Sequence, residues 1–208
     1  MEFWNSDITN ASWDKLLELN KEIDFLLIGG WAVYLYTKLQ KSKDIDIIVD
    51  YGALRKISQR YTLAKNDRLK KYEIKLERFD IDVYLPKYSK LAVPPEDILL
   101  KFRDNIDGIN VPKVEVLMTL KLGALSERKE SIKGGKDAID ILALLFYSGF
   151  KTEKLKEVLD GYAHPEYARL LLDTLNKFDK KMLSYLNLNE KSFSRYKNEK
   201  AEELKKIL

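Results

Sequence analysis

The chain contains no cysteine, and histidine occurs only once among its 208 residues. Without thiols, the protein has no structural disulfide, no thiolate zinc site and no cysteine nucleophile. The single histidine, His164, precedes Pro165 between two expected helices, so we interpret it as a loop residue and propose no histidine-based mechanism. Long apolar runs are also missing. The longest, near residues 139–146, is interrupted by Asp140 and is far shorter than a membrane span.

The composition is that of a packed globular protein, with 45% hydrophobic and 34% charged residues. The first ten residues, MEFWNSDITN, are acidic and lack the apolar core of a secretion signal. We therefore expect a cytoplasmic protein without a membrane partner. The net charge of +4 favours contact with phosphates but is too small to diagnose nucleic-acid binding.

The sequence pattern changes at about Pro95. Helical and extended patterns alternate before this point, whereas nearly everything after it has a helical pattern. We therefore expect an α+β protein in which an N-terminal mixed sheet flanked by helices, residues 1–94, precedes a C-terminal helical bundle, residues 95–208. Ser12 is expected to cap the first helix, Gly134-Gly135 to form a loop between helices, and Gly149 to end a helix.

The remaining expected elements follow from hydrophobic periodicity. The expected strands cover residues 25–28, 44–49, 72–77 and 79–85, and the expected helices cover 31–40, 114–128, 136–147, 153–159, 166–178 and 191–208, with a further helix starting at Pro94-Pro95. The most informative stretch lies between residues 25 and 50, where a strand, two glycines, a helix and an acidic strand follow one another.

Asp44 and Asp46 open the second strand. Side chains alternate along a strand, so both carboxylates point to the same side. Two neighbouring carboxylates repel one another unless a cation lies between them, and oxygen ligands suit Mg²⁺. Because Mg²⁺ is usually completed by substrate phosphates, the pair predicts a phosphate-bearing substrate.

Gly29 and Gly30 support this interpretation, because the missing side chains let a triphosphate approach backbone amides at a helix start. A third carboxylate is expected from the strand near residues 79–85, and we prefer Asp82 to Asp80 because apolar neighbours flank it symmetrically. Two magnesium ions would then be held by Asp44, Asp46 and Asp82, one activating an acceptor hydroxyl and one holding the triphosphate. The acceptor proton would pass to Asp82 or to a bound water.

These residues resemble the nucleotidyltransferase core of the DNA polymerase beta superfamily over roughly residues 24–85. The resemblance rests on Gly29-Gly30, Asp44, Asp46 and Asp82, which match in order and approximate spacing. It implies a nucleotidyltransferase fold and transfer of a nucleoside monophosphate from an NTP to an acceptor hydroxyl. Trp31 departs from the pattern, because many members have a phosphate-binding serine there. That contact falls either to Ser42 or to backbone amides.

A second resemblance lies in LKLGALSER and KDAIDILALL, which are similar to abortive-infection and toxin-type (AbiEii-like) nucleotidyltransferases. It implies that the helices close one side of the active-site cleft. It also implies that Lys121 contacts the triphosphate, and the residues expected to line or brace the cleft are Arg128, Lys136, Asp137 and Asp140. Lys136 and Asp140 are four apart on a helix, a spacing that is also ordinary on a solvated surface. Toxin-type relatives favour tRNA or protein as acceptor and imply an antitoxin partner, while other relatives modify small molecules such as antibiotics.

Two alternatives remain at this point. In the first, the fold has lost catalysis and serves as a nucleotide- or protein-binding module, although clustered acids argue against that. A P-loop enzyme is disfavoured because no GxxxxGK[ST] segment is present. Tyr34, Tyr36 and Tyr84 lie near the expected cleft, and we interpret them as packing residues rather than as base-stacking residues.

Overall fold

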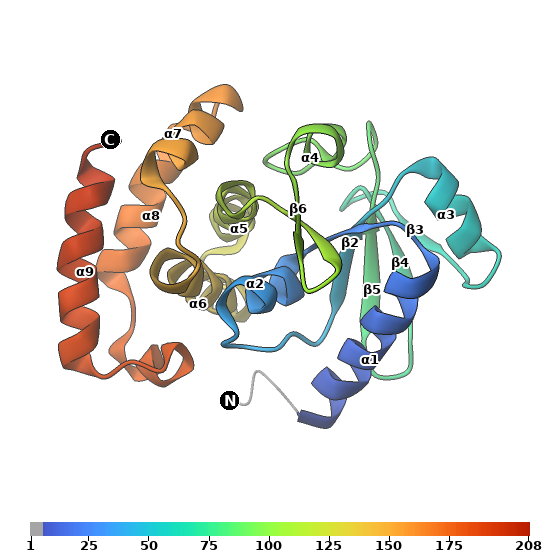
Figure 1. The fold of residues 1–208 in the computed structure, drawn as a ribbon, viewed down its shortest axis with the longest axis horizontal. Helices are drawn as coiled ribbons and strands as arrows, with labels where there is room; N and C mark the ends of the chain where they lie inside the picture. Colours follow the sequence, from blue (N-terminus) through green and yellow to red (C-terminus); the bar gives the residue numbers. More distant parts are fainter. Residues whose placement is uncertain (1–5) are drawn as a thin grey trace. The chain divides into compact units, whose positions relative to one another are not determined.

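The computed structural model describes residues 6–208. The first five residues of the predicted N-terminal domain lie outside the described residues. The chain divides into two compact units, Met1–Lys113 and Val114–Leu208. In Figure 1 the first unit runs from blue to green, and the second continues through yellow to red. A mixed sheet is followed by a mostly helical part, so the predicted α+β class is confirmed.

The first unit contains a five-stranded sheet in the order β1-β2-β5-β4-β3 and a separate two-stranded hairpin. Its strands are β1 (Leu26–Ile28), β2 (Ile45–Ile48), β3 (Ala64–Asn66), β4 (Lys71–Lys75) and β5 (Asp80–Tyr84), and the hairpin pairs β6 (Arg103–Ile106) with β7 (Ile109–Pro112). Its helices are α1 (Ser6–Glu22), α2 (Gly29–Thr37), α3 (Tyr51–Ser58) and α4 (Pro95–Lys101). The central strands β2 and β5 are parallel, whereas the other sheet pairs are antiparallel.

Alternation of side chains places one set of apolar residues of the central strands on a single face of the sheet. Ile45 and Ile47 of β2 lie opposite Ile81 and Val83 of β5, and all four are buried. Ile74 of β4 pairs with Ile81 and is also buried, so the apolar face continues across three strands. The residues between these positions on the same strands therefore face the other way, and they include the acids.

Helix α1 packs against α2 through aromatic side chains. The rings of Trp13 and Trp31 lie 4.9 Å apart, and Tyr34 meets Trp31 edge to face at 5.5 Å. The indole N–H of Trp31 donates to the hydroxyl of Ser12 at 2.9 Å, and both residues are fully buried. The prediction that Ser12 caps the first helix is therefore wrong. Ser12 lies inside α1, where its oxygen satisfies a buried donor instead of a helix end.

The second unit is helical. Its elements are α5 (Val114–Arg128), α6 (Ile132–Tyr147), α7 (Thr152–Gly161), α8 (Glu166–Lys177), the 3₁₀ helix η1 (Lys180–Leu186) and α9 (Glu190–Lys205). The predicted Gly134-Gly135 loop is wrong, because α6 begins earlier with Ser131 as its cap. A Cβ on Gly134 would lie 2.4 Å from the Arg128 carbonyl oxygen, so glycine permits the tight turn between α5 and α6. Gly149, with a φ of +68°, follows α6 as predicted.

The two units divide nineteen residues later than the boundary predicted from the sequence, at 113/114 and not at 94/95. Helix α4 starts at the predicted proline pair, but the chain then returns as the β6–β7 hairpin. Asp107 and Gly108 form its two-residue turn with φ values of +53° and +80°, and an Asp-Gly pair is a strong hairpin signal. Within residues 6–208, none of the helices is both long and apolar enough to cross a membrane.

The buried bond between Ser12 and Trp31 leads to a stability prediction. Ser12→Ala leaves the indole N–H without its acceptor, so we expect it to lower the free energy of unfolding by about 1–3 kcal/mol. Ser58→Ala is the control, because the Ser58 hydroxyl bonds to the Arg55 carbonyl on an exposed surface and should cost under about 0.5 kcal/mol. Urea denaturation of the three proteins checks this. Equal stabilities would show that the buried bond contributes nothing.

Candidate functional site

Three acids form a row across the face of the sheet opposite to Ile45, Ile47, Ile81 and Val83. Asp46 of β2 is the register partner of Asp82 on β5, and Asp82 is in turn the partner of Glu73 on β4. Partners in register project from the same face, so Asp46, Asp82 and Glu73 follow one another along a line perpendicular to the strands. We call these three residues the acid row. The sequence predicted its first two members as metal ligands, and the parallel pairing of β2 with β5 brings them together.

Asp82 has an unusual electrostatic environment. Burial disfavours its charged form, and the nearby charge of Asp46 adds to that effect, so the pKa of Asp82 is raised to about 6. The contact with Lys71 acts in the opposite direction but does not outweigh the other two effects. Two neighbouring carboxylates that disfavour each other's charge favour the approach of a cation.

Lys71 of β4 lies within the acid row. Its ammonium nitrogen is 2.5 Å from Asp82 Oδ2 and 3.1 Å from Glu73 Oε1, and its side chain is 11% exposed. Burial alone would lower the pKa of Lys71, but the contacts with Asp82 and Glu73 outweigh it and raise the pKa. The pKa of Glu73 falls to about 2, chiefly through its bond with Lys71.

Sequence reasoning missed both Lys71 and Glu73. Each lies on a strand whose register could not be deduced, although the alternation in Lys71-Tyr72-Glu73-Ile74 does place the two charged residues on one face. This alternation is the signal that the sequence offered. It did not show that β4 pairs with β5, and this pairing is what brings Glu73 opposite Asp82.

Asp44 and Asp80 lie at the edge of this arrangement. Asp44 precedes β2, and its Oδ1 accepts a hydrogen bond of 3.3 Å from the backbone N–H of Asp80. The Asp80 carboxylate pairs with Lys75 at 2.7 Å. The register therefore places Asp82, and not Asp80, opposite Asp46.

Gly29 lies against Asp46 at the start of α2. Its φ is +69°, and a Cβ built there would stand 2.1 Å from Asp46 Oδ2. Only glycine permits this close approach in this backbone conformation. Gly30 is buried in the first turn of α2, whose N-terminus has no side-chain cap. The positive end of the α2 dipole thus adjoins the acid row, and helix starts of this kind bind phosphate groups.

The two other residues discussed for phosphate binding are both buried. Trp31 belongs to the core, where its N–H bonds to Ser12. Ser42 is 3% exposed and lies between α2 and β2. The predicted role of Ser42 in holding a phosphate stays a prediction.

The residues fit a magnesium ion that is completed by substrate. Among residues 6–208, no group of three or more Asp, Glu or His side chains is placed to hold a metal by itself. Mg²⁺ commonly uses one or two carboxylates and takes its remaining ligands from water and substrate phosphates. Asp46 and Asp82 provide such a pair, and the glycine start of α2 adjoins it.

The charged residues predicted in the helices form a network within the second unit. Lys121 of α5 pairs with Asp140 at 2.7 Å and with Asp137 at 3.4 Å, and Arg128 Nε donates to the other oxygen of Asp137 at 2.7 Å. The two aspartate side chains are each 2% exposed, so these ion pairs connect α5 to α6 in the interior. Lys136 lies in the first half of α6 and is partly exposed. Contacts of Lys121, Arg128 and Lys136 with a nucleotide stay predictions.

The remaining expectations concern aromatic residues and His164. His164 lies between α7 and α8, where its ring stacks on Tyr167 at 4.6 Å, so it is a loop residue as predicted. Tyr34 packs against Trp31, and the Tyr36 hydroxyl donates to the Pro112 carbonyl at 2.8 Å. Both tyrosines are therefore packing residues. Tyr84 ends β5 and is partly exposed.

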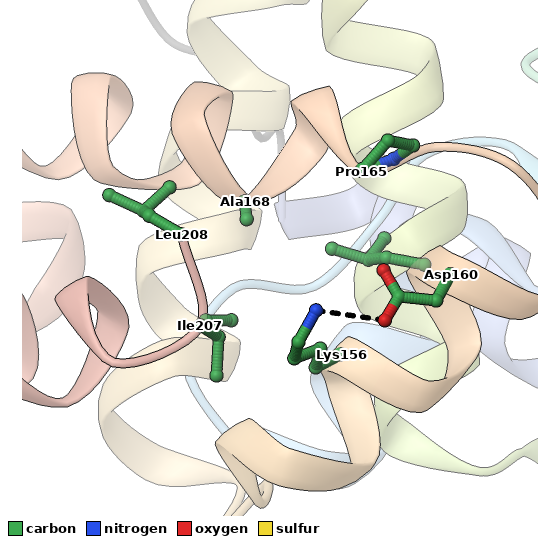
Figure 2. Close-up of a pocket in the computed structure, with 7 residues that line it drawn as sticks. Lys156, Asp160, Pro165, Ala168, Ile207 and Leu208 are labelled. Carbon is green, nitrogen blue, oxygen red and sulfur yellow. Dashed lines mark hydrogen bonds and ion pairs between the residues drawn. The ribbon is translucent and has the colours of Figure 1, made fainter.

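A cavity in the second unit is unrelated to the acid row. Figure 2 shows it between α7, the start of α8 and the C-terminal residues, with Lys156 paired to Asp160 at 2.8 Å. Its volume is about 60 Å³. Small-molecule pockets are roughly 300–1,000 Å³, so this cavity is too small for a nucleotide.

Comparison with known proteins gives matches among solved structures alone. No protein-family model matches the sequence, and no curated protein matches it. The chain is similar to an antigenic nucleotidyltransferase-like protein from Paracoccidioides brasiliensis, with 18% identity and a TM-score of 0.43, covering 80% of this chain and 93% of that one. It is also similar to JHP933 from Helicobacter pylori, with 16% identity and a TM-score of 0.48, covering 98% and 92%. Both identities are low, so the chemistry of the site is inferred from the residues described above.

The close approach of Gly29 to Asp46 yields a matched test. Gly29→Ala adds both backbone strain and a clash with Asp46, whereas Gly108→Ala adds strain alone, because its φ is +80° and no atom lies within 4 Å of the new Cβ. We expect Gly108→Ala to cost about 1–2 kcal/mol. Gly29→Ala should cost about 1–3 kcal/mol more through overpacking. Chemical denaturation checks the difference, and equal losses would contradict the contact.

The raised pKa of Asp82 predicts a pH effect. An unfolded aspartate loses its proton near its ordinary pKa of 3.8, whereas folded Asp82 keeps it until about pH 6. The folded state therefore binds more protons between these values, and Asp82 lowers the free energy of unfolding as pH rises from about 4 to about 6. A ¹³Cγ NMR titration of Asp82 measures its pKa in the folded protein. A midpoint near 6 that falls when Mg²⁺ is added is expected, and a midpoint at 4 or below would exclude the described environment.

Proposed function

We propose that this protein is a magnesium-dependent nucleotidyltransferase that moves a nucleoside monophosphate from an NTP to an acceptor hydroxyl. The observation that carries the proposal is the in-register pair of Asp46 and Asp82 beside the glycine start of α2, with Gly29 packed against Asp46. This arrangement combines two cation ligands with a helix start suited to phosphate. Each element on its own is common, but their combination matches the needs of a nucleoside triphosphate bound with its cation.

The protein's own residues would act by positioning and by neutralising charge, which dominate the catalysis of phosphoryl-group transfer. Asp46 and Asp82 would hold the cation, with Asp44 at the edge of the same site. Backbone N–H groups at the start of α2 would donate to the triphosphate, and the absent side chain of Gly29 would keep that approach open. When bound, Mg²⁺ contributes Lewis-acid stabilisation of the negative charge on the phosphates.

Within the helical unit, ion pairs join Lys121, Arg128, Asp137 and Asp140 into a network. Removing one partner from a buried ion pair leaves an uncompensated charge and is strongly destabilising. We therefore assign Asp137 and Asp140 to bracing α5 against α6. Lys121 and Arg128 are proposed to serve both this bracing and nucleotide binding, and Lys136 to serve nucleotide binding.

For the acceptor, we propose a chemical class and not a particular molecule. The sequence resemblance to toxin-type enzymes favours tRNA or protein, with an antitoxin as a partner, whereas small hydroxylated molecules are the acceptors that other relatives suggest. A binding module without catalysis is the competing function. Against that alternative, neighbouring carboxylates repel one another, and binding alone does not require them.

The proposal predicts the effect of removing single carboxylates. Asp46→Asn and Asp82→Asn should each reduce transfer of label from an α-labelled NTP by about 10²-fold or more, because each removes one cation ligand. Asp80→Asn is the matched control on the same strand as Asp82, since its carboxylate pairs with Lys75, and it should retain activity within a few fold. The assay contains Mg²⁺ and is run with and without total tRNA, which identifies the acceptor class.

Two results would refute this assignment. Full activity of folded Asp46→Asn would exclude the acid pair as the catalytic site. Metal-dependent NTP binding without transfer to tRNA, protein or small hydroxylated acceptors would support the binding module instead. Circular dichroism of each variant separates loss of activity from loss of fold.

A further inference from the structure

Lys71 places a positive charge inside the proposed metal site. Its ammonium lies between two members of the acid row, 2.5 Å from Asp82 Oδ2 and 3.1 Å from Glu73 Oε1. The lysine projects from β4, the strand next to β5, so the contact crosses neighbouring strands of a single sheet. One oxygen of a proposed cation ligand is thus already bound to a cation that the chain itself provides.

The surroundings hold Lys71 in this position. Its side chain is 11% exposed, and Glu73 on its other side is fixed by Asn66 Nδ2 at 3.0 Å and by Lys75 at 3.3 Å. Burial disfavours an unpaired ammonium, so movement away from both carboxylates would be costly. Lys75 differs from Lys71, because it is 59% exposed and does not contact Asp82.

The formal charges near Lys71 suit a single divalent ion. The three carboxylates of the acid row and the Lys71 ammonium together carry a formal charge of minus two, while Lys75 is offset by its second partner Asp80. In the absence of a nucleotide, one divalent cation balances the charge of these four groups. A second divalent ion bound to Asp82 would lie close to the Lys71 ammonium. Both side chains are largely buried, so the two positive charges would repel one another strongly.

Resting on the function proposed above, we infer that Lys71 replaces one of the two magnesium ions predicted from the sequence, so that the acid row binds a single divalent cation. Lys71 is in this role a positioning residue. It neutralises Asp82 and holds its carboxylate opposite Asp46, and the acceptor side of the site then depends on an ammonium group instead of on a metal.

The number of bound ions tests this inference without relying on activity. Mn²⁺ is titrated into the full-length protein with a non-hydrolysable NTP analogue, with protein in excess over analogue, and free Mn²⁺ is followed by EPR. We expect one Mn²⁺ for each protein–analogue complex in the wild-type protein. Lys71→Met, which keeps the length of the side chain but not its charge, should bind two.

Two variants serve as controls. Lys71→Arg keeps the positive charge and should bind one ion. Lys75→Met removes the other lysine that contacts Glu73 and should also bind one, because Asp82 keeps its partner. A purely structural role for Lys71 predicts lower stability of Lys71→Met with no change in ion number.

The outcomes are distinct. Two ions in the wild-type protein would overturn the inference while leaving the proposed nucleotidyltransferase function intact, and this result does not depend on whether Lys71→Met folds. One ion in folded Lys71→Met would overturn it as well. No Mn²⁺ binding by the wild-type protein would instead refute the proposed function on which the inference rests.

Discussion

The parallel pairing of β2 with β5 is the constraint on which the candidate site depends. It brings Asp46 opposite Asp82 although the two residues are thirty-six positions apart in the chain. The hydrophobic effect maintains this register, because Ile45, Ile47, Ile81 and Val83 fill the opposite face of the same strands. A shift by one residue would bury the acids and expose the apolar residues. The energy that holds the core thus also holds two repelling carboxylates together.

Close contacts around the acid row limit what can occupy it. Gly29 leaves space for Asp46 on one side, and Lys71 contacts Asp82 on the other. The raised pKa of Asp82 reflects burial and the neighbouring acid, and the lysine offsets only part of this. Two buried neighbouring carboxylates lower the stability of the fold. Functional sites commonly carry such a cost, because their chemistry requires charged groups close together.

The helical unit uses buried charge differently. Lys121 pairs with Asp137 and Asp140, and Arg128 pairs with Asp137, so the four groups join α5 to α6. Buried ion pairs contribute little net stability, but they specify one packing arrangement because the alternatives leave charges unpaired. The same residue types therefore have two roles in this protein. In the sheet, the three acids of the acid row outnumber the two lysines that contact them, Lys71 and Lys75, whereas in the helices two acids pair with two bases.

By itself, the sequence determined the α+β class, most strands and helices, and the acids and glycines of the candidate site, because periodicity and close spacing are local properties of the chain. It missed the β6–β7 hairpin, assigned Ser12 to a helix cap and placed Gly134-Gly135 in a loop. Only the tertiary structure decided that Asp82 lies opposite Asp46, and that Lys71 and Glu73 complete the row. Strand register and the partners of buried polar groups depend on contacts between residues far apart in sequence, and no local pattern encodes them.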